Sequence, residues 1–235
     1  MSSYPGLHPH PLRRIAVGGA LVTALTFGFG SASATLAQDA TPASSPAAEA
    51  TPTVVEPVQV TLTLIGTDNQ VVGVARLTQE APGAEVLITV TTAENSGLTP
   101  GEHGIHIHEA GVCDPTADPP FDSAGGHFNP ENGVHGAPDD PNSHAGDLGN
   151  MTVKDNGSFL FQTTSTRISL YPGDKNSLAD ADGSSLMIHE HADDLHTDPS
   201  GESGGRVACG VIFHPEPGAV QSATPVTSPE ATPVG

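Results

Sequence analysis

Short runs of alternating, β-branched residues recur along most of this chain, and they constrain its fold more than any other feature. The eight runs are VQVTLTLI (58–65), VVGVARLT (71–78), EVLITVTT (85–92), GIHIHE (104–109), DLGNMTVK (147–154), SFLFQTTS (158–165), SLMIHE (185–190) and RVACGVIF (206–213). Successive side chains of a strand point to opposite faces, so such alternation indicates strands with one buried face. Turn-forming residues separate the runs, and no helical period is convincing. The sequence therefore predicts an all-β domain, an antiparallel sandwich or barrel of eight strands.

The connections between these runs differ in length and character. Asp155-Asn156-Gly157 is the strongest hairpin signal and predicts a tight turn between the runs at 147–154 and 158–165. Residues 109–146 and 190–205 are too long and too polar to be simple turns. Long loops inside a compact domain are usually functional or disordered. Because the first is rich in histidine, we expect it to be functional.

The first 34 residues have the features of an export signal. Arg13-Arg14 precedes an apolar run from Ile15 to Phe29, and Ala32-Ser33-Ala34 resembles a small-residue cleavage site, with cleavage after Ala34. An uncleaved anchor is the alternative, but the run is short for a membrane span and contains glycines. We expect an exported protein, periplasmic or extracellular at the cell envelope, with no membrane attachment once the signal is removed. The paired arginines also permit twin-arginine export.

Two Ala/Thr/Pro-rich segments flank the predicted domain. Residues 35–57 and 215–235 contain few bulky apolar side chains, so we expect a disordered linker and a disordered tail around a domain at 58–214. The chain has a formal net charge of -20. Such a charge disfavours nucleic acid and anionic membranes as partners. An anionic substrate would need a local positive site.

Cys113 and Cys209 are the only cysteines. In an exported chain a single disulfide is the simplest interpretation, and two free thiols are the alternative.

Ten histidines follow the export segment, and seven of them fall into three groups. The groups are His103, His106 and His108; His127, His135 and His144; and His189. A single histidine is usually a solvated surface residue, so the argument depends on their number and placement.

The strand histidines form a clamp on a rigid element. His106 and His108 share one face of their predicted strand, while Ile105 and Ile107 share the other. His189 ends another predicted strand. Three or four imidazoles with an open position suit a redox copper, but a catalytic zinc accepts the same ligands. The ligand types alone do not separate these two metals.

The loop histidines suit a different site. His127, His135 and His144, together with Asp147, supply four ligands of the kind that a closed structural zinc takes. A loop this polar lacks a core of its own, and a metal can serve as one.

Six ordered motifs carry a resemblance to a known family. They are GEHGIHIHE, AGGHFNP, HGAP, HAGDLGN, IHEHADDL and GGRVACGVIF, and in this order they resemble the copper,zinc superoxide dismutases over residues 58–213. The resemblance implies an eight-stranded Greek-key β-barrel with two long functional loops. It also implies copper and zinc as cofactors and superoxide as substrate, converted to dioxygen and hydrogen peroxide.

The resemblance also implies residue roles. Copper would be bound by His106, His108, His127 and His189, and zinc by His127, His135, His144 and Asp147, with His127 bridging the metals. Asp193 matches the carboxylate that hydrogen-bonds one ligand of each metal, and Arg206 matches the arginine beside the copper channel. Arg206 and His127 would thus be the catalytic residues, and Cys113 and Cys209 match the family's disulfide.

Other histidines match no ligand position. The family pattern gives His103 a structural role, and we expect His191, His196 and His214 to be solvated. Eukaryotic relatives carry lysines in the loop before the last strand, whereas residues 190–205 here contain five acids and no Lys or Arg. We therefore expect the rate not to fall steeply with added salt.

Three questions stay open at this point. A non-catalytic copper/zinc-binding or metal-delivery protein is the alternative function, although such a protein would not need Arg206. A copper-only dismutase would lack the zinc ligands that this chain retains. Family members occur as monomers and as homodimers, and the sequence does not choose between them.

Overall fold

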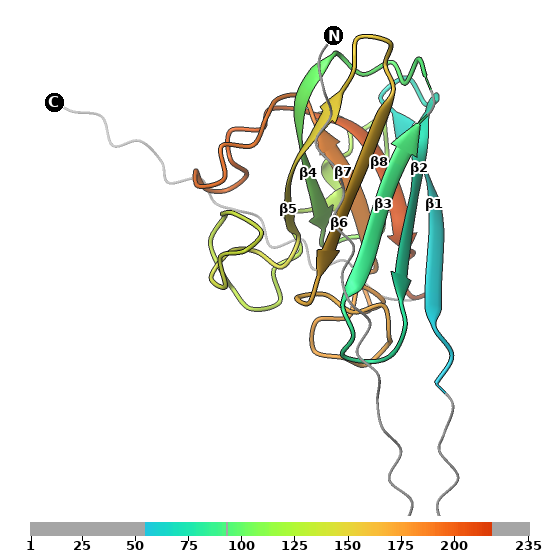
Figure 1. Ribbon diagram of the computed structural model, residues 1–235, viewed down its shortest axis with the longest axis vertical. Coiled ribbons are helices and arrows are strands. Elements are labelled where there is room, and N and C mark those ends of the chain that lie inside the picture. Colours follow the sequence, from blue (N-terminus) through green and yellow to red (C-terminus); the bar gives the residue numbers. More distant parts are fainter. Residues whose placement is uncertain (1–54, 93, 218–235) are drawn as a thin grey trace, which may run out of the picture. The chain divides into compact units, whose positions relative to one another are not determined.

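The predicted runs form eight strands in the part of the chain that the computed structural model describes, residues 55–92 and 94–217 (Figure 1). The strands are β1 (Val58–Gly66), β2 (Val71–Gln79), β3 (Val86–Thr92), β4 (Gly101–His108), β5 (Asp147–Val153), β6 (Phe159–Ser165), β7 (Ser184–His189) and β8 (Arg206–Phe213). A three-residue 3₁₀ turn, η1 (Asp122–Ala124), lies in the first long loop. The boundaries agree with the alternation because each strand ends where turn residues begin.

The strands form one antiparallel sheet in the order β5-β4-β7-β8-β1-β2-β3-β6. Neighbours in this order are hydrogen-bonded, and β5 and β6 at its two ends bring the sheet to a nearly closed barrel (Figure 1). Non-consecutive strands such as β4 and β7 pair, so the sheet contains crossovers. The all-β barrel predicted from the sequence is confirmed.

The hairpin predicted at Asp155-Asn156-Gly157 is wrong, although the turn itself is present. Gly157 has a positive φ of 77°, and the Lys154 N–H donates to the Ser158 carbonyl oxygen at 2.9 Å. Yet β5 pairs only with β4, and β6 only with β3. The turn therefore connects the two strands at which the barrel ends, and its Asn156 carbonyl accepts instead from the N–H of Asn95.

Strand β4 explains how the barrel presents its histidines. Ile105 and Ile107 are fully buried in the main hydrophobic core. His106 and His108 point to the opposite face, but they are also buried because the two long loops cover that face. The β-branched residues thus fix the strand against the core, and the loops enclose the imidazoles.

The first long loop is fixed to β8 of the barrel by a disulfide between Cys113 and Cys209, whose Cα atoms are 5.7 Å apart. This confirms the predicted pairing and indicates an oxidising compartment. The described residues contain no helix that is long and apolar enough to span a membrane. The predicted export signal, nearly all of the predicted linker and the predicted tail after residue 217 lie outside the described residues.

Candidate metal centre

Four buried imidazoles from three elements lie close together at the face of β4 opposite Ile105 and Ile107. His106 and His108 come from β4, and His189 is the last residue of β7. His127 comes from the first long loop, where its backbone pairs with that of His108 in an isolated antiparallel β-bridge. One ring nitrogen from each of the four lies within 4.8 Å of the others, and the Nε2 atoms of His108 and His189 are 3.4 Å apart. The ring centroids of His106 and His127 are 4.0 Å apart. We call this group the strand cluster.

Two nitrogens of the strand cluster have no hydrogen-bond partner. Among the buried side-chain nitrogens of the described residues, only His106 Nδ1 and His127 Nε2 lack one. Burying a polar atom without a partner is costly, and native proteins rarely do so. These atoms therefore fit a metal ion as their partner.

A second group of ligand atoms converges on Asp147. The Asp147 Oδ1 atom lies 2.7 Å from His127 Nδ1, 3.2 Å from His135 Nδ1 and 3.3 Å from His144 Nδ1. The Nδ1 atoms of His144 and His127 are 3.4 Å apart. Ligands at about 2.0–2.1 Å from a tetrahedral zinc lie about 3.3 Å from one another. This group, which we call the loop cluster, fits such an ion.

The loop cluster has two candidates for its fourth ligand. His106, His127, His135 and Asp147 also have ligand atoms within 4.8 Å of one another. However, His106 Nε2 is hydrogen-bonded to Asp193, and its Nδ1 belongs to the strand cluster. His144 Nδ1 has no such competing partner and is therefore the better fourth ligand.

His127 belongs to both clusters through different atoms. Its Nδ1 contacts Asp147 in the loop cluster, and its unpartnered Nε2 faces the strand cluster. One imidazole can hold two metal ions only in this way, with one nitrogen on each.

Asp193 connects the two clusters by hydrogen bonds to one histidine of each, without being a metal ligand itself. Its Oδ2 lies 2.8 Å from His106 Nε2, and its Oδ1 lies 2.9 Å from His135 Nε2. Each ring nitrogen that faces Asp193 donates to it, which leaves the opposite nitrogen free to bind a metal. Asn150 holds Asp193 in turn, because its side chain accepts from the Asp193 N–H and donates to the Asp193 carbonyl.

Burial and carboxylates shift the ring pKa values in opposite directions. Desolvation by burial lowers the pKa of His108 and His189 well below the usual value, and it lowers the pKa of His127 to about 4. Burial also acts to lower the pKa of His135, but hydrogen bonds to Asp147 and Asp193 outweigh it and raise the pKa to about 9. The rings of His108, His127 and His189 are therefore neutral at pH 7, the form that binds a metal. In the metal-free loop cluster, the His135 ring is protonated at this pH.

Arg206 stands beside the strand cluster at the start of β8, paired in register with His189. Its Nη1 donates to the Phe121 carbonyl and its Nη2 to the Gly125 carbonyl, both at 2.6 Å. It lines a pocket of about 570 Å³ with His108, His127 and His189, and among the described residues of the pocket wall it is the only Lys or Arg. A fixed cation thus faces the imidazoles at an opening to solvent.

The structure brings together every residue that the sequence assigned to the site: His106, His108, His127, His135, His144, Asp147, His189, Asp193 and Arg206. His103 lies outside both clusters, since its ring nitrogens contact the carbonyls of His189 and Thr99. His191, His196 and His214 are exposed, as expected.

Sequence reasoning missed two residues that hold the site by hydrogen bonds, Gly125 and Asp198. The Gly125 carbonyl accepts from Arg206 and also lies 2.9 Å from His108 Nδ1. Asp198 accepts the backbone N–H of His135 at 2.5 Å, linking the two long loops. A backbone carbonyl leaves no sequence signal, and Asp198 is one of several acids in its loop.

Comparison with known proteins shows to which family this chain belongs. The sequence profile described as copper/zinc superoxide dismutase (SODC) matches residues 71–212. The chain belongs to the copper/zinc superoxide dismutase family. The ligand chemistry of the two clusters agrees with the family's metals, copper and zinc.

Two relatives named copper/zinc superoxide dismutases match this chain over most of their own length. Superoxide dismutase [Cu-Zn] 2 of Aquifex aeolicus (strain VF5) is 42% identical over 150 residues, which is 63% of this chain and 83% of the relative. Superoxide dismutase [Cu-Zn] 1 of the same organism is 41% identical over 150 residues, 63% of this chain and 84% of the relative.

A solved structure has a similar fold. The crystal structure of a superoxide dismutase-like protein from Bacillus subtilis matches with a TM-score of 0.57 and 37% identity, covering 65% of this chain and 97% of that one.

Proposed function

We propose that this protein is a superoxide dismutase, which converts two superoxide anions and two protons to dioxygen and hydrogen peroxide. Copper would be held by His106, His108, His127 and His189, and zinc by His127, His135, His144 and Asp147. The observation that carries the proposal is the His127 ring, with one nitrogen in each cluster. A binding or delivery protein has no need to couple two metals through one ring.

The chain's own groups supply substrate binding and proton handling. When bound, copper supplies one-electron oxidation and reduction, and zinc acts as a Lewis acid on the shared ring. Arg206 offers a permanently charged donor for the superoxide anion next to the imidazoles. His127 lines the same pocket and its Nε2 has no hydrogen-bond partner, so we assign this nitrogen as the group that holds a proton for the peroxide product.

Export to the periplasm or the extracellular side of the envelope accompanies this function. The support is the Arg13-Arg14 pair, the apolar run after it and the disulfide of an oxidising compartment. An exported dismutase would act on superoxide outside the cytoplasm.

The test combines metal analysis with activity of the purified, metal-loaded protein. We expect about one copper and one zinc per chain and rapid superoxide dismutation. His108→Ala removes a copper ligand whose ring nitrogens are hydrogen-bonded neither to Asp193 nor to a residue of the loop cluster, so it should abolish activity and copper binding while retaining zinc. His196→Ala, an exposed histidine outside both clusters, is the matched control and should behave as the wild type.

Two results would contradict the proposal. A wild-type protein that carries both metals but does not dismutate superoxide would favour the non-catalytic binding or delivery role. A protein that takes up zinc alone would indicate a structural metal site.

A further inference from the structure

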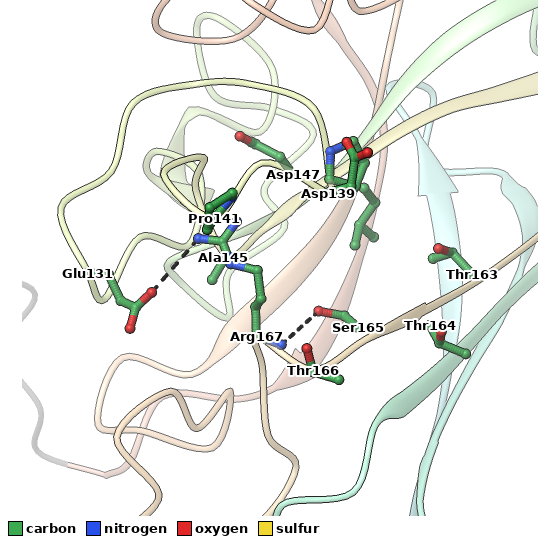
Figure 2. A pocket seen from close by; sticks show the side chains of 12 residues that line it. Glu131, Asp139, Pro141, Ala145, Asp147, Thr163, Thr164, Ser165, Thr166 and Arg167 are labelled. Atoms are coloured by element: carbon green, nitrogen blue, oxygen red, sulfur yellow. Dashed lines mark hydrogen bonds and ion pairs between the residues drawn. The ribbon is translucent and has the colours of Figure 1, made fainter.

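Arg167 lies just after β6, outside both ligand clusters, yet only 18% of its side chain is exposed. Figure 2 shows this side chain extending from the segment after β6 toward the loop that carries Pro141 and Ala145, with Asp147 nearby. Burial of a guanidinium is costly unless its N–H groups find acceptors. The acceptors that Arg167 uses therefore indicate what it does.

All the acceptors of the Arg167 guanidinium belong to one turn. Nη1 donates to Ser143 Oγ at 2.6 Å, to the Asp140 carbonyl at 3.1 Å and to the His144 carbonyl at 3.3 Å. Nη2 donates to the Ser143 carbonyl. A planar guanidinium can reach several acceptors at once, so this single side chain fixes the turn from Asp140 to His144.

That turn delivers one ligand of the loop cluster. It ends at His144, whose backbone N–H donates to Asp147 Oδ2 at 3.1 Å and whose Nδ1 lies 3.3 Å from Asp147 Oδ1. Asp140, Pro141 and Asn142 of this turn are exposed, and the apolar core is reached only at Ala145, after His144. The turn before His144 therefore depends on polar contacts for its position.

We propose that Arg167 is the positioning residue of the zinc half of the site. Its guanidinium holds the turn from Asp140 to His144 so that His144 Nδ1 faces the other ligands before zinc arrives. The residue touches neither metal nor substrate and acts only through the backbone of His144 and the residues before it. This inference rests on the proposed assignment of His144 to zinc.

The ion pair between Arg167 and Glu131 does not position the turn from Asp140 to His144. Glu131 Oε2 lies 3.8 Å from Nη2, and Glu131 Oε1 lies 3.2 Å from Lys175 Nζ. The Glu131 side chain is 49% exposed, and exposed ion pairs contribute little. Figure 2 shows this pair as a dashed line from Glu131 to the Arg167 guanidinium, beside Pro141. Glu131→Gln therefore removes the charge partner and leaves the contacts to the turn intact.

The test measures zinc release from the copper- and zinc-loaded protein into a chromophoric chelator. We expect Arg167→Met to release zinc 10–100-fold faster than the wild type, as is typical when a residue that supports a metal ligand is lost. Arg167→Lys should behave nearly like Arg167→Met, because one ammonium cannot span the turn's acceptors. Glu131→Gln and Arg76→Met, which removes an exposed arginine of β2, should stay within about twofold of the wild type.

Amide hydrogen exchange separates positioning from general destabilisation. In Arg167→Met we expect faster exchange in residues 133–146 and unchanged exchange in the strands. Arg167→Lys repeats both measurements if Arg167→Met does not fold.

Three outcomes would overturn the inference: zinc release from the folded Arg167 variants within twofold of the wild type, Arg167→Lys matching the wild type, or Glu131→Gln releasing zinc as fast as Arg167→Met. The proposed function fails differently. If His144→Ala holds zinc as tightly as the wild type, the zinc assignment itself is wrong. If His144→Ala loses zinc but the Arg167 variants release zinc at the wild-type rate, only the role of Arg167 is contradicted.

Discussion

Arg206 and His108 share a single acceptor, the carbonyl oxygen of Gly125. The Arg206 Nη2 atom donates to this oxygen at 2.6 Å, and His108 Nδ1 lies 2.9 Å from it. The same backbone group thus orients the cation to which we assign superoxide binding and a ring of the strand cluster. The tautomer that donates to Gly125 leaves His108 Nε2 free for copper.

Arg206→Ala should lower kcat/KM for superoxide by at least about tenfold, because it removes the only cation of the pocket. Copper and zinc content should not change, since Arg206 is no ligand. Arg206→Lys should recover part of the rate, since charge alone attracts the anion but the contacts to Phe121 and Gly125 need the guanidinium. Pulse radiolysis with metal analysis checks this. Full activity of Arg206→Ala would remove the residue from the mechanism.

The rate should depend weakly on ionic strength. Residues 190–205 contain no Lys or Arg, and the pocket wall also includes the acids Glu109 and Asp122. Attraction therefore acts only over short range at Arg206, where salt screens little. We expect kcat/KM to change less than about twofold between 10 and 150 mM ionic strength.

A variant with a new cation provides the control for this salt prediction. Asp122→Lys places a cation at the exposed rim of the pocket and should make the rate fall with salt. A steep fall in the wild type would show long-range steering by charges that we do not assign.

Alternation predicted the fold well because it reports which face of a strand packs in the core, as along β1, β2 and β3. Ile105 and Ile107 are both fully buried, as their spacing indicated. The turn at Asp155-Asn156-Gly157 misled us because turn chemistry fixes only the local backbone. Which strands pair across a barrel is decided by non-local packing.

The ligand residues could be predicted because metals demand a few side-chain types at characteristic spacings. The convergence of His127 on His108 could not be predicted from spacing, since the long loop between them sets it, and the family resemblance supplied it. Arg167 was missed for another reason. Its partners are mostly backbone carbonyls, so no pattern of side chains points to it.

Asp193→Asn should weaken zinc binding by about 10–100-fold. Both carboxylate oxygens of Asp193 accept, from His106 and from His135, but an amide can accept at only one of these positions. One ring must then turn or lose its partner. Equilibrium competition with a chelator measures the affinity. Asp194→Asn is the matched control, because Asp194 contacts only its own loop, at His196 and Thr197.

Loss of the disulfide should affect both stability and activity. The bridge joins residues 96 apart in sequence, so the chain-entropy model assigns it about 4–5 kcal/mol of the free energy of unfolding. It also anchors the loop whose Phe121 and Gly125 carbonyls hold Arg206. We expect Cys113→Ser/Cys209→Ser to unfold at lower denaturant and, while still folded, to show a reduced kcat/KM. An unchanged rate in the folded variant would mean that Arg206 is held without the bridge.

Proton release can test whether His127 bridges the metals. The pKa of His135 is raised to about 9 in the metal-free protein, so its ring is protonated at pH 7.5 and zinc binding must release about one proton. Burial lowers the pKa values of His106, His108 and His189, so these rings are already neutral and release none when copper binds.

His127 is also neutral at that pH, with a pKa of about 4, and it can bind a second metal only by losing its remaining ring proton. Copper addition to the zinc-loaded protein should therefore release about one further proton. Calorimetry in buffers of different ionisation enthalpy counts these protons. No release in the copper step would mean that the two metals sit side by side without sharing the ring.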